Sequence, residues 1–154
     1  MKKELGLDKD KIKEISKIKN EPEWMREFRL KSYEEFVKTP NPNFGPELKI
    51  DFDKINYYKK VSDKVEDNWE NVSCPIRNTF EDVGLIDAEK KYLDGIGAQF
   101  ESEVVYHNMI EELKEKGVIF SSTDDALKNH PEIFKKYFGK LVKYNENKYT
   151  ALNG

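Results

Sequence analysis

One cysteine and two histidines are the side chains of this sequence best suited to nucleophilic or metal chemistry. They are Cys74, His107 and His130. No two of them stand at a metal-binding spacing such as Cys-x-x-Cys or His-x-x-x-His, and a structural metal site usually has four ligands. The sequence therefore predicts no metal site, no cofactor site and no catalytic residue within this chain.

Cys74 precedes Pro75 at the expected start of a helix. A thiolate is stabilised near the amino end of a helix, so an enzyme that uses Cys74 with a histidine is one alternative. That alternative requires Cys74→Ser to abolish turnover. The sequence assigns no base, no orienting group and no oxyanion donor, so we expect Cys74 to be a small residue at a helix start.

The two histidines stand at expected junctions between elements, His107 before an apolar helix and His130 before Pro131. A general base needs a pocket and a partner within hydrogen-bond reach, and the sequence identifies no partner for either imidazole. We therefore expect each histidine to satisfy a backbone group rather than to catalyse a reaction.

The segment Gly95-Ile96-Gly97 is similar to the beginning of a phosphate-binding loop. The third glycine of such a loop is missing, no Gly-Lys-Ser/Thr follows, and no strand clearly precedes the segment. We predict a turn that lets backbones pack closely, and no nucleotide site.

Aromatic residues are abundant, with 2 tryptophans, 8 tyrosines and 9 phenylalanines. Aromatic side chains at helical spacing are usually part of a core, and we expect this of Trp24, Phe28 and Phe36. Tyr57 and Tyr58 follow an irregular, proline-rich segment. They are the candidate partner surface.

The composition indicates one soluble domain over residues 1–154. Charged residues make up 37% of the chain, but the formal net charge is only −3, with a pI near 5.6 and a mean hydropathy of −0.85. A basic footprint for nucleic acid is absent, and no apolar run approaches the roughly 20 residues that span a bilayer. A single cysteine agrees with a reducing compartment, so we expect a cytoplasmic protein without nucleic-acid or membrane partners.

Two helices are expected near the amino terminus. The first covers about residues 8–19, with Asp8 as its cap and Ile12 on its apolar face. The second begins at Pro22 as its first residue and ends at Thr39, because the residue before Pro40 disfavours helical geometry. Arg29 falls on the apolar face of the second helix, so we predict that it is partly buried and paired with a carboxylate.

The rest of the chain predicts short elements. Residues 40–67 contain several prolines and read as an irregular segment that wraps around the helices. Further helices are expected from Cys74 to Val83, from Asp87 to Leu93, from Met109 to Lys116, from Ser122, and from Pro131 to Phe138, with extended structure over residues 98–106 and a buried strand at 118–120. The predicted fold class is mainly α with a few short strands (α+β).

Residues 20–36, Asn-Glu-Pro-Glu-Trp-Met-Arg-Glu-Phe-Arg-Leu-Lys-Ser-Tyr-Glu-Glu-Phe, combine helix-start chemistry with a high aromatic content. This stretch resembles the SufB/SufD family of iron–sulfur cluster assembly proteins, and its SufB branch in particular. The resemblance continues through ordered blocks at residues 55–58, 89–93, 95–99, 101–108, 117–120 and 130–134, and reaches the final Ala-Leu-Asn at 151–153.

The resemblance implies a small helical domain that precedes a long β-helix, which this sequence does not contain. On that basis we interpret residues 145–154 as a linker towards the β-helix. Family members build clusters together with the SufC ATPase and SufD, and a sulfur-donor protein is a further implied partner. The residues around Cys74 depart from the family pattern, which is polar or acidic there, so no cluster-building role is transferred to Cys74.

Together these points predict the amino-terminal domain of a SufB scaffold subunit, with a structural and protein-interaction role. Iron–sulfur clusters are commonly held by four thiolates, and one cysteine cannot supply them. We therefore expect the cluster to belong to the full-length protein or its complex, and this domain to be neither cluster-binding nor enzymatic. The alternative is a stand-alone truncated paralogue that acts as a protein–protein interaction adaptor.

Overall fold

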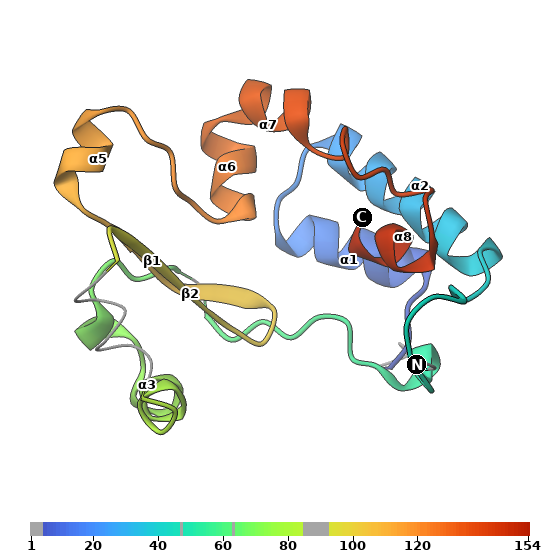
Figure 1. Cartoon of the computed structure of the whole chain (residues 1–154), viewed down its shortest axis with the longest axis horizontal. Helices are drawn as coiled ribbons and strands as arrows, with labels where there is room; N and C mark the ends of the chain where they lie inside the picture. Colours follow the sequence, from blue (N-terminus) through green and yellow to red (C-terminus); the bar gives the residue numbers. More distant parts are fainter. Residues whose placement is uncertain (1–4, 47, 63, 85–92) are drawn as a thin grey trace. The chain divides into compact units, whose positions relative to one another are not determined.

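The computed structural model describes residues 5–46, 48–62, 64–84 and 93–154 (Figure 1). The chain divides into two compact units: unit 1 holds residues 1–57 and 124–154, and unit 2 holds residues 58–123. Most of the described elements are helices, and two antiparallel strands form the described sheet. This confirms the predicted fold class. The expectation of a single domain stays a prediction, because a division by contacts does not decide whether the units fold separately.

Unit 1 begins with two helices that the sequence predicts within one residue at most ends. Helix α1 spans Lys9–Ile18, and its cap Asp8 accepts a 2.7 Å hydrogen bond from the backbone N–H of Lys11. Helix α2 spans Glu23–Lys38 and packs against α1. The side chain of Ile12 is buried, as expected for the apolar face of α1.

Prolines set both ends of α2. Pro22 has φ −66° and ψ 156°, so it is the cap before the helix. The prediction that Pro22 is the first helical residue is therefore wrong by one position. Thr39 is extended, with ψ 128°, because the following Pro40 disfavours the helical region for its neighbour. The predicted end of the helix at Thr39 is confirmed.

Residues near the carboxyl end of unit 1 return to α2. Helix α6 spans Thr123–Asn129 and α7 spans Pro131–Tyr137, which confirms the two helices predicted there. The ring of Phe28 on α2 lies 5.2 Å from that of Phe138 and 5.4 Å from that of Tyr144. Segments more than 100 residues apart in the sequence therefore share one aromatic cluster.

Gly139 permits this close approach to α2. Its φ is +65°, a region that side chains rarely adopt, and an added Cβ would lie 2.9 Å from Cζ of Phe28. Glycine lacks that Cβ and accepts positive φ without penalty. The glycine after α7 is thus required by both the turn and the packing.

The carboxyl end contains a helix that the sequence analysis did not predict, while the role of residues 145–154 as a linker stays a prediction. Helix α8 spans Lys148–Asn153, packs against α2 and buries Ala151. Asn147 and Thr150 form a capping box, in which each side chain bonds to the backbone of the other. The capping box and the buried alanine stabilise a helix that is too short and polar to be evident from periodicity.

Residues 40–51 form no helix or strand among the described positions, which leave out residue 47. A short 3₁₀ turn, η1, follows at Phe52–Lys54, and the ring of Phe52 lies 5.1 Å from that of Phe36 on α2. The N–H of Gly6 also donates to the carbonyl of Ile55 (2.8 Å). The predicted wrapping of residues 40–67 stays a prediction.

Unit 2 is organised around a β-hairpin. Strand β1 spans Gly95–Phe100, strand β2 spans Glu103–Met109, and they pair antiparallel with a bulge between Ala98 and Gln99. Glu66 adds a short parallel bridge on the other edge of β2: its N–H donates to the carbonyl of Val105, at 3.0 Å.

The core of unit 2 surrounds Trp69, which lies in the 3₁₀ turn η2 (Trp69–Asn71) and is 3% exposed. Its ring is 5.3 Å from Tyr106 and 5.6 Å from Phe80. Phe80 belongs to helix α3 (Cys74–Glu81), which confirms the helix predicted there. The remaining members of the buried cluster are Val72, Ile76, Ile96, Ala98 and Val105.

Two predictions for this part of unit 2 are wrong, and one is confirmed. Gly95-Ile96-Gly97 lies in β1 instead of a turn, because Ile96 is buried in the Trp69 cluster and the strand pairs with β2. The extended structure predicted over residues 98–106 is confirmed: these residues belong to two strands joined at residues 101–102. Residues 118–120 form no strand, because no described strand pairs with them. Their side chains are exposed, whereas the prediction was a buried strand.

Two further helix predictions have mixed outcomes. Helix α5 spans Glu111–Glu115, so it is shorter than predicted, and Met109 belongs to β2. The helix predicted at 87–93 lies outside the described residues except for Leu93, which is not helical. Of the helices that are described, none combines the length and the apolar character needed to span a bilayer.

Candidate functional site

Cys74 is exposed and is the first residue of α3, as the sequence predicts. The Nη2 atom of Arg77, one turn later, lies 3.5 Å from its sulfur, while Nη1 is 2.7 Å from Oε2 of Glu70. The contact with Cys74, together with the nearby carboxylates, raises the pKa of the Arg77 guanidinium above its usual value. The thiol therefore lies beside a guanidinium that is already paired with a carboxylate.

His107 lies within β2, opposite Gly97, and not before a helix. Its imidazole is 4.6 Å from the ring of Phe120, and its Nε2 atom is buried with no hydrogen-bond partner among the described residues. The expectation that this imidazole satisfies a backbone group is therefore wrong for Nε2. Phe120 also fills the space over Gly95, where an added Cβ would be 3.0 Å from Cδ1 of the ring.

His130 is at the predicted junction, as the cap residue of α7. Its backbone carbonyl accepts a 3.0 Å hydrogen bond from the N–H of Phe134, but its imidazole makes no capping hydrogen bond. Within residues 5–46, 48–62, 64–84 and 93–154, His, Cys, Asp and Glu form no group of three or more that could hold a metal ion.

Tyr57 and Tyr58, the candidate partner surface, are half-buried, and each hydroxyl has a partner within its own unit. The Tyr57 hydroxyl donates to the carbonyl of Phe52 at 3.1 Å, and partial burial, with the nearby Asp53 charge, raises the pKa of Tyr57. The Tyr58 hydroxyl donates to Oε1 of Glu103 at 2.5 Å. Their role as a partner surface stays a prediction.

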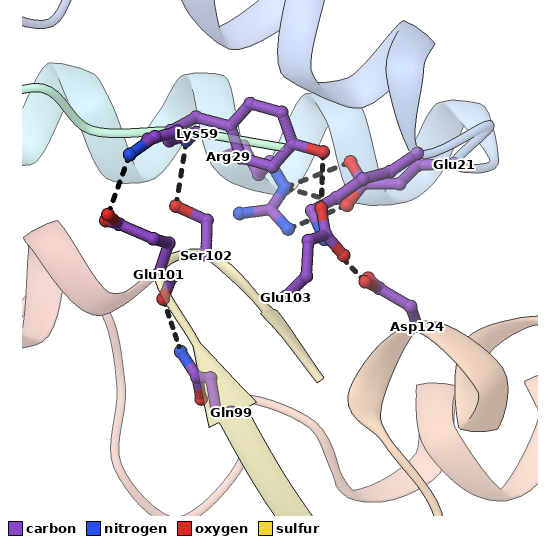
Figure 2. A network of polar contacts seen from close by, with 10 residues as sticks. Glu21, Arg29, Lys59, Gln99, Glu101, Ser102, Glu103 and Asp124 are labelled. Carbon is purple, nitrogen blue, oxygen red and sulfur yellow. Dashed lines mark hydrogen bonds and ion pairs between the residues drawn. The ribbon is translucent and has the colours of Figure 1, made fainter. Parts of the chain in front are cut away.

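A set of polar contacts holds residues 58–59 to the turn of the hairpin, as Figure 2 shows for Lys59. The backbone N–H of Lys59 donates to Oγ of Ser102 (3.0 Å), and its ammonium group is 2.9 Å from Glu101. The side chain of Gln99 bonds to the Glu101 carbonyl, at 3.1 Å. Sequence reasoning missed this clamp, although a serine between two strand-like runs is a recognised turn signal.

Arg29 is paired as predicted. Its Nε atom lies 2.9 Å from Oε2 of Glu21 and its Nη2 atom 2.7 Å from Oε1, so the guanidinium and the carboxylate form a bidentate pair (Figure 2). The Glu21 side chain is 1% exposed and that of Arg29 27%. Glu21 lies before α2 and outside its helical repeat, so spacing alone could not have identified it as the partner.

A hollow of about 760 Å³ lies within unit 2 beside the ends of β1 and β2. None of Cys74, His107, Tyr57 and Tyr58 lines it. Two of its polar groups are already engaged: Asn68 accepts from the Glu70 N–H at 3.0 Å, and Asn108 from the Met109 N–H at 2.7 Å. The predicted chemistry-bearing side chains are therefore not gathered in this hollow.

Comparison with known proteins gives a consistent result. The family model for the SufBD protein N-terminal region matches residues 10–154. An iron–sulfur cluster assembly SufBD family protein of Staphylococcus aureus (strain USA300) is 52% identical over 151 residues, which cover 97% of this chain and 32% of that protein. A protein of the same description from Staphylococcus saprophyticus is 50% identical over the same shares.

The chain thus spans about a third of the length of these curated relatives. The match covers both units, including the hairpin and the helices that pack on α2. On this match, the chain belongs to the SufBD family of iron–sulfur cluster assembly proteins and corresponds to the family's N-terminal region.

Proposed function

We propose that this chain is the N-terminal region of a SufB-type scaffold subunit and that it serves a structural and protein-binding role in cluster assembly. The observation that carries this proposal is the family match over residues 10–154 with relatives about three times as long. The assignment to SufB rather than SufD rests on the resemblance of residues 20–36. In this proposal the protein works in the cytoplasm with SufC and SufD, and a sulfur donor supplies the complex.

The proposed role leaves the cluster to other parts of the full protein or its partners. Clusters are commonly bound by four thiolates, and this chain has one cysteine. That thiol is exposed and lies against Arg77, which is paired with Glu70. A positively charged neighbour already in a salt bridge is a poor second ligand for iron, so we propose no cluster and no catalysis within these residues.

Anaerobic incubation of the chain with iron and sulfide tests this part of the proposal. We expect no stoichiometric visible absorption, and the same spectrum for Cys74→Ser. A stoichiometric chromophore that Cys74→Ser removes, and that survives dilution, would show that the chain itself builds a cluster.

A graft tests the assignment to SufB. In a bacterium that holds both SufB and SufD, the matching N-terminal part of each protein is replaced by this chain. We expect the SufB graft, but not the SufD graft, to restore iron–sulfur enzyme activity in the corresponding deletion strain. Restoration by the SufD graft alone would reverse the assignment, and full activity of SufB lacking this part would remove the proposed role.

A further inference from the structure

Helix α7 and the segment after it expose a set of apolar side chains on unit 1. Ile133 is 52% exposed, Tyr137 63%, Leu141 93% and Val142 62%. Apolar side chains that lie together at the surface often mark interaction sites, whereas single ones need no explanation. We call these four residues and the lysines among them the α7 patch.

The lysines of the α7 patch are Lys135, Lys136, Lys140 and Lys143, and all four are exposed. Residues 131–143 contain only one carboxylate, Glu132, so this segment has a formal charge of +3 in a chain whose net charge is −3. In the part of the chain that the structure describes, none of the four ammonium groups pairs with a carboxylate; Lys135 and Lys136 lie over the rings of Trp24 and Tyr137. The patch is therefore both apolar and positively charged.

A hollow adjoins the exposed apolar residues. It measures about 190 Å³ and is lined by Tyr137, Leu141 and Val142 together with Phe28 and Tyr144. A hollow of this kind can receive an apolar side chain of a partner, and anchors of binding are typically such buried side chains. Lys136, Lys140 and Lys143 are sequence neighbours of these lining residues, so positive charge lies close to the hollow.

We propose that the α7 patch binds an acidic, apolar segment of a partner protein, with an apolar side chain in the hollow and carboxylates facing the lysines. A second copy that docks by its own α7 patch would bring lysines against lysines, which disfavours this symmetric self-association. A bilayer is also a poor fit, because α7 has 7 residues and the patch is hollowed, whereas interfacial helices are generally longer and lay a continuous apolar face into the lipid. This proposal does not depend on the role in cluster assembly.

Binding of a fluorescent peptide of alternating glutamate and leucine to the full chain tests the proposal. We expect saturable binding that weakens as salt is added, since the carboxylate–lysine attraction is screened. Leu141→Asp and Val142→Asp together should weaken binding by about tenfold or more, and so should Lys135→Glu with Lys140→Glu. Because Leu141 and Val142 are exposed, these changes should leave the fold intact, which circular dichroism checks.

Matched controls lie on α2 of the same unit. Val37 is 61% exposed, a fraction similar to the 62% of Val142, and Lys31 is exposed as well. Val37→Asp and Lys31→Glu make the same chemical changes elsewhere, so we expect them to bind the peptide as the natural chain does. Backbone amide shifts on adding the peptide should cluster at residues 133–143.

Four outcomes would overturn the proposal. They are no binding up to about 1 mM peptide, equal loss in the α2 controls, equal binding of polyglutamate, and preferential sedimentation with phosphatidylcholine vesicles that contain phosphatidylserine. Polyglutamate binding would show a purely electrostatic surface without an apolar anchor. Preferential vesicle binding would assign the patch to anionic lipid instead.

Discussion

The two units of this chain differ in sign of charge. Unit 2 has 8 Lys and Arg residues against 14 Asp and Glu, a formal charge of −6, whereas unit 1 has the other 19 and 16, a charge of +3. The small net charge of the whole chain conceals this difference. Net charge averaged over a chain can therefore exclude a global field but not a local docking surface such as the α7 patch.

The units also differ in how sequence becomes packing. Unit 2 is one continuous stretch, and its core forms around Trp69 and the hairpin. Unit 1 is discontinuous: residues 124–154 return to the first helices, and α8 and Phe138 complete the packing of α2. The comparison suggests that unit 2 depends on strand pairing and one large aromatic residue, and unit 1 on the return of a distant segment.

Trp69→Ala tests this difference in packing between the units and has the largest expected effect on stability. Removing a buried tryptophan that contacts Tyr106 and Phe80 should cost about 4 kcal/mol, through lost burial and the cavity left behind. We expect amide-exchange protection to disappear in β1, β2 and α3 while α1 and α2 keep theirs. Val83→Ala, at a side chain that is 63% exposed, should change nothing measurable.

Parallel loss of protection in α1 and α2 would contradict the comparison. It would mean that the two units unfold as one cooperative body, which is the behaviour of the single domain expected from the sequence.

The helices of unit 1 could be predicted because their signals are local. Asp8 caps α1, Pro22 and Pro40 bound α2, and apolar residues recur at helical spacing between them. Even the burial of Arg29 followed from its place on that face. Its partner could not be found, since Glu21 reaches Arg29 only through the turn that joins α1 to α2. Helix α8 was missed because its stability comes from its cap and from packing on α2.

Unit 2 was harder to predict because strand pairing is not local. Gly95-Ile96-Gly97 reads as a turn, yet it is a strand once Ile96 enters the Trp69 cluster. Residues 118–120 are as apolar as a buried strand, but an apolar run becomes a strand only where a neighbour pairs with it. Of the proposed site residues, position along the chain was predictable for Cys74 and His130, whereas the strand environment of His107 was not.

Arg29→Leu has the second largest expected effect on stability and tests the Arg29–Glu21 pair of unit 1. The Glu21 carboxylate, 1% exposed, would keep its burial and lose its partner. The expected cost is about 3 kcal/mol, near the lower end for breaking a buried ion pair because Arg29 is partly exposed. Chemical denaturation measures it. Glu21→Gln in the Arg29→Leu background should recover part of the loss, and Arg26→Leu, on the exposed side of α2, is the control.

Failure of Glu21→Gln to recover stability would show that Arg29 acts through packing of its alkyl chain instead of its charge. The single variant Glu21→Gln completes a double-mutant cycle. Its coupling energy reports the Arg29–Glu21 interaction alone and so separates the charge of Arg29 from the packing of its alkyl chain.

Asn147→Ala has a smaller expected effect and tests whether α8 is a true helix. The Asn147 side chain accepts from the N–H groups of Tyr149 and Thr150, at 2.9 and 3.1 Å. Loss of the cap should destabilise unit 1 by about 1 kcal/mol and increase exchange at residues 148–153. Asn145→Ala, two residues earlier and exposed, is the matched control. An unchanged exchange pattern would show that the Asn147 cap does not stabilise α8.

The smallest effect concerns an exposed ion pair between α1 and α2. The ammonium group of Lys9 lies 2.6 Å from Oε1 of Glu34, and this hydrogen bond, followed by the charge of Lys9, holds the pKa of Glu34 below its ordinary value of 4.5. A carboxyl whose folded-state pKa is lowered stabilises the fold above its unfolded pKa, and that contribution is lost as pH falls through the folded value.

Carbon-detected NMR titration should show the lowered pKa of Glu34, and Lys9→Met should return it towards 4.5, whereas Lys17→Met on the same helix should not. Added salt should reduce the shift, because both side chains are more than half exposed. Titration of Glu34 at its ordinary pKa in every variant would show that the pair forms too rarely in solution to link α1 to α2, and that packing alone holds these helices together.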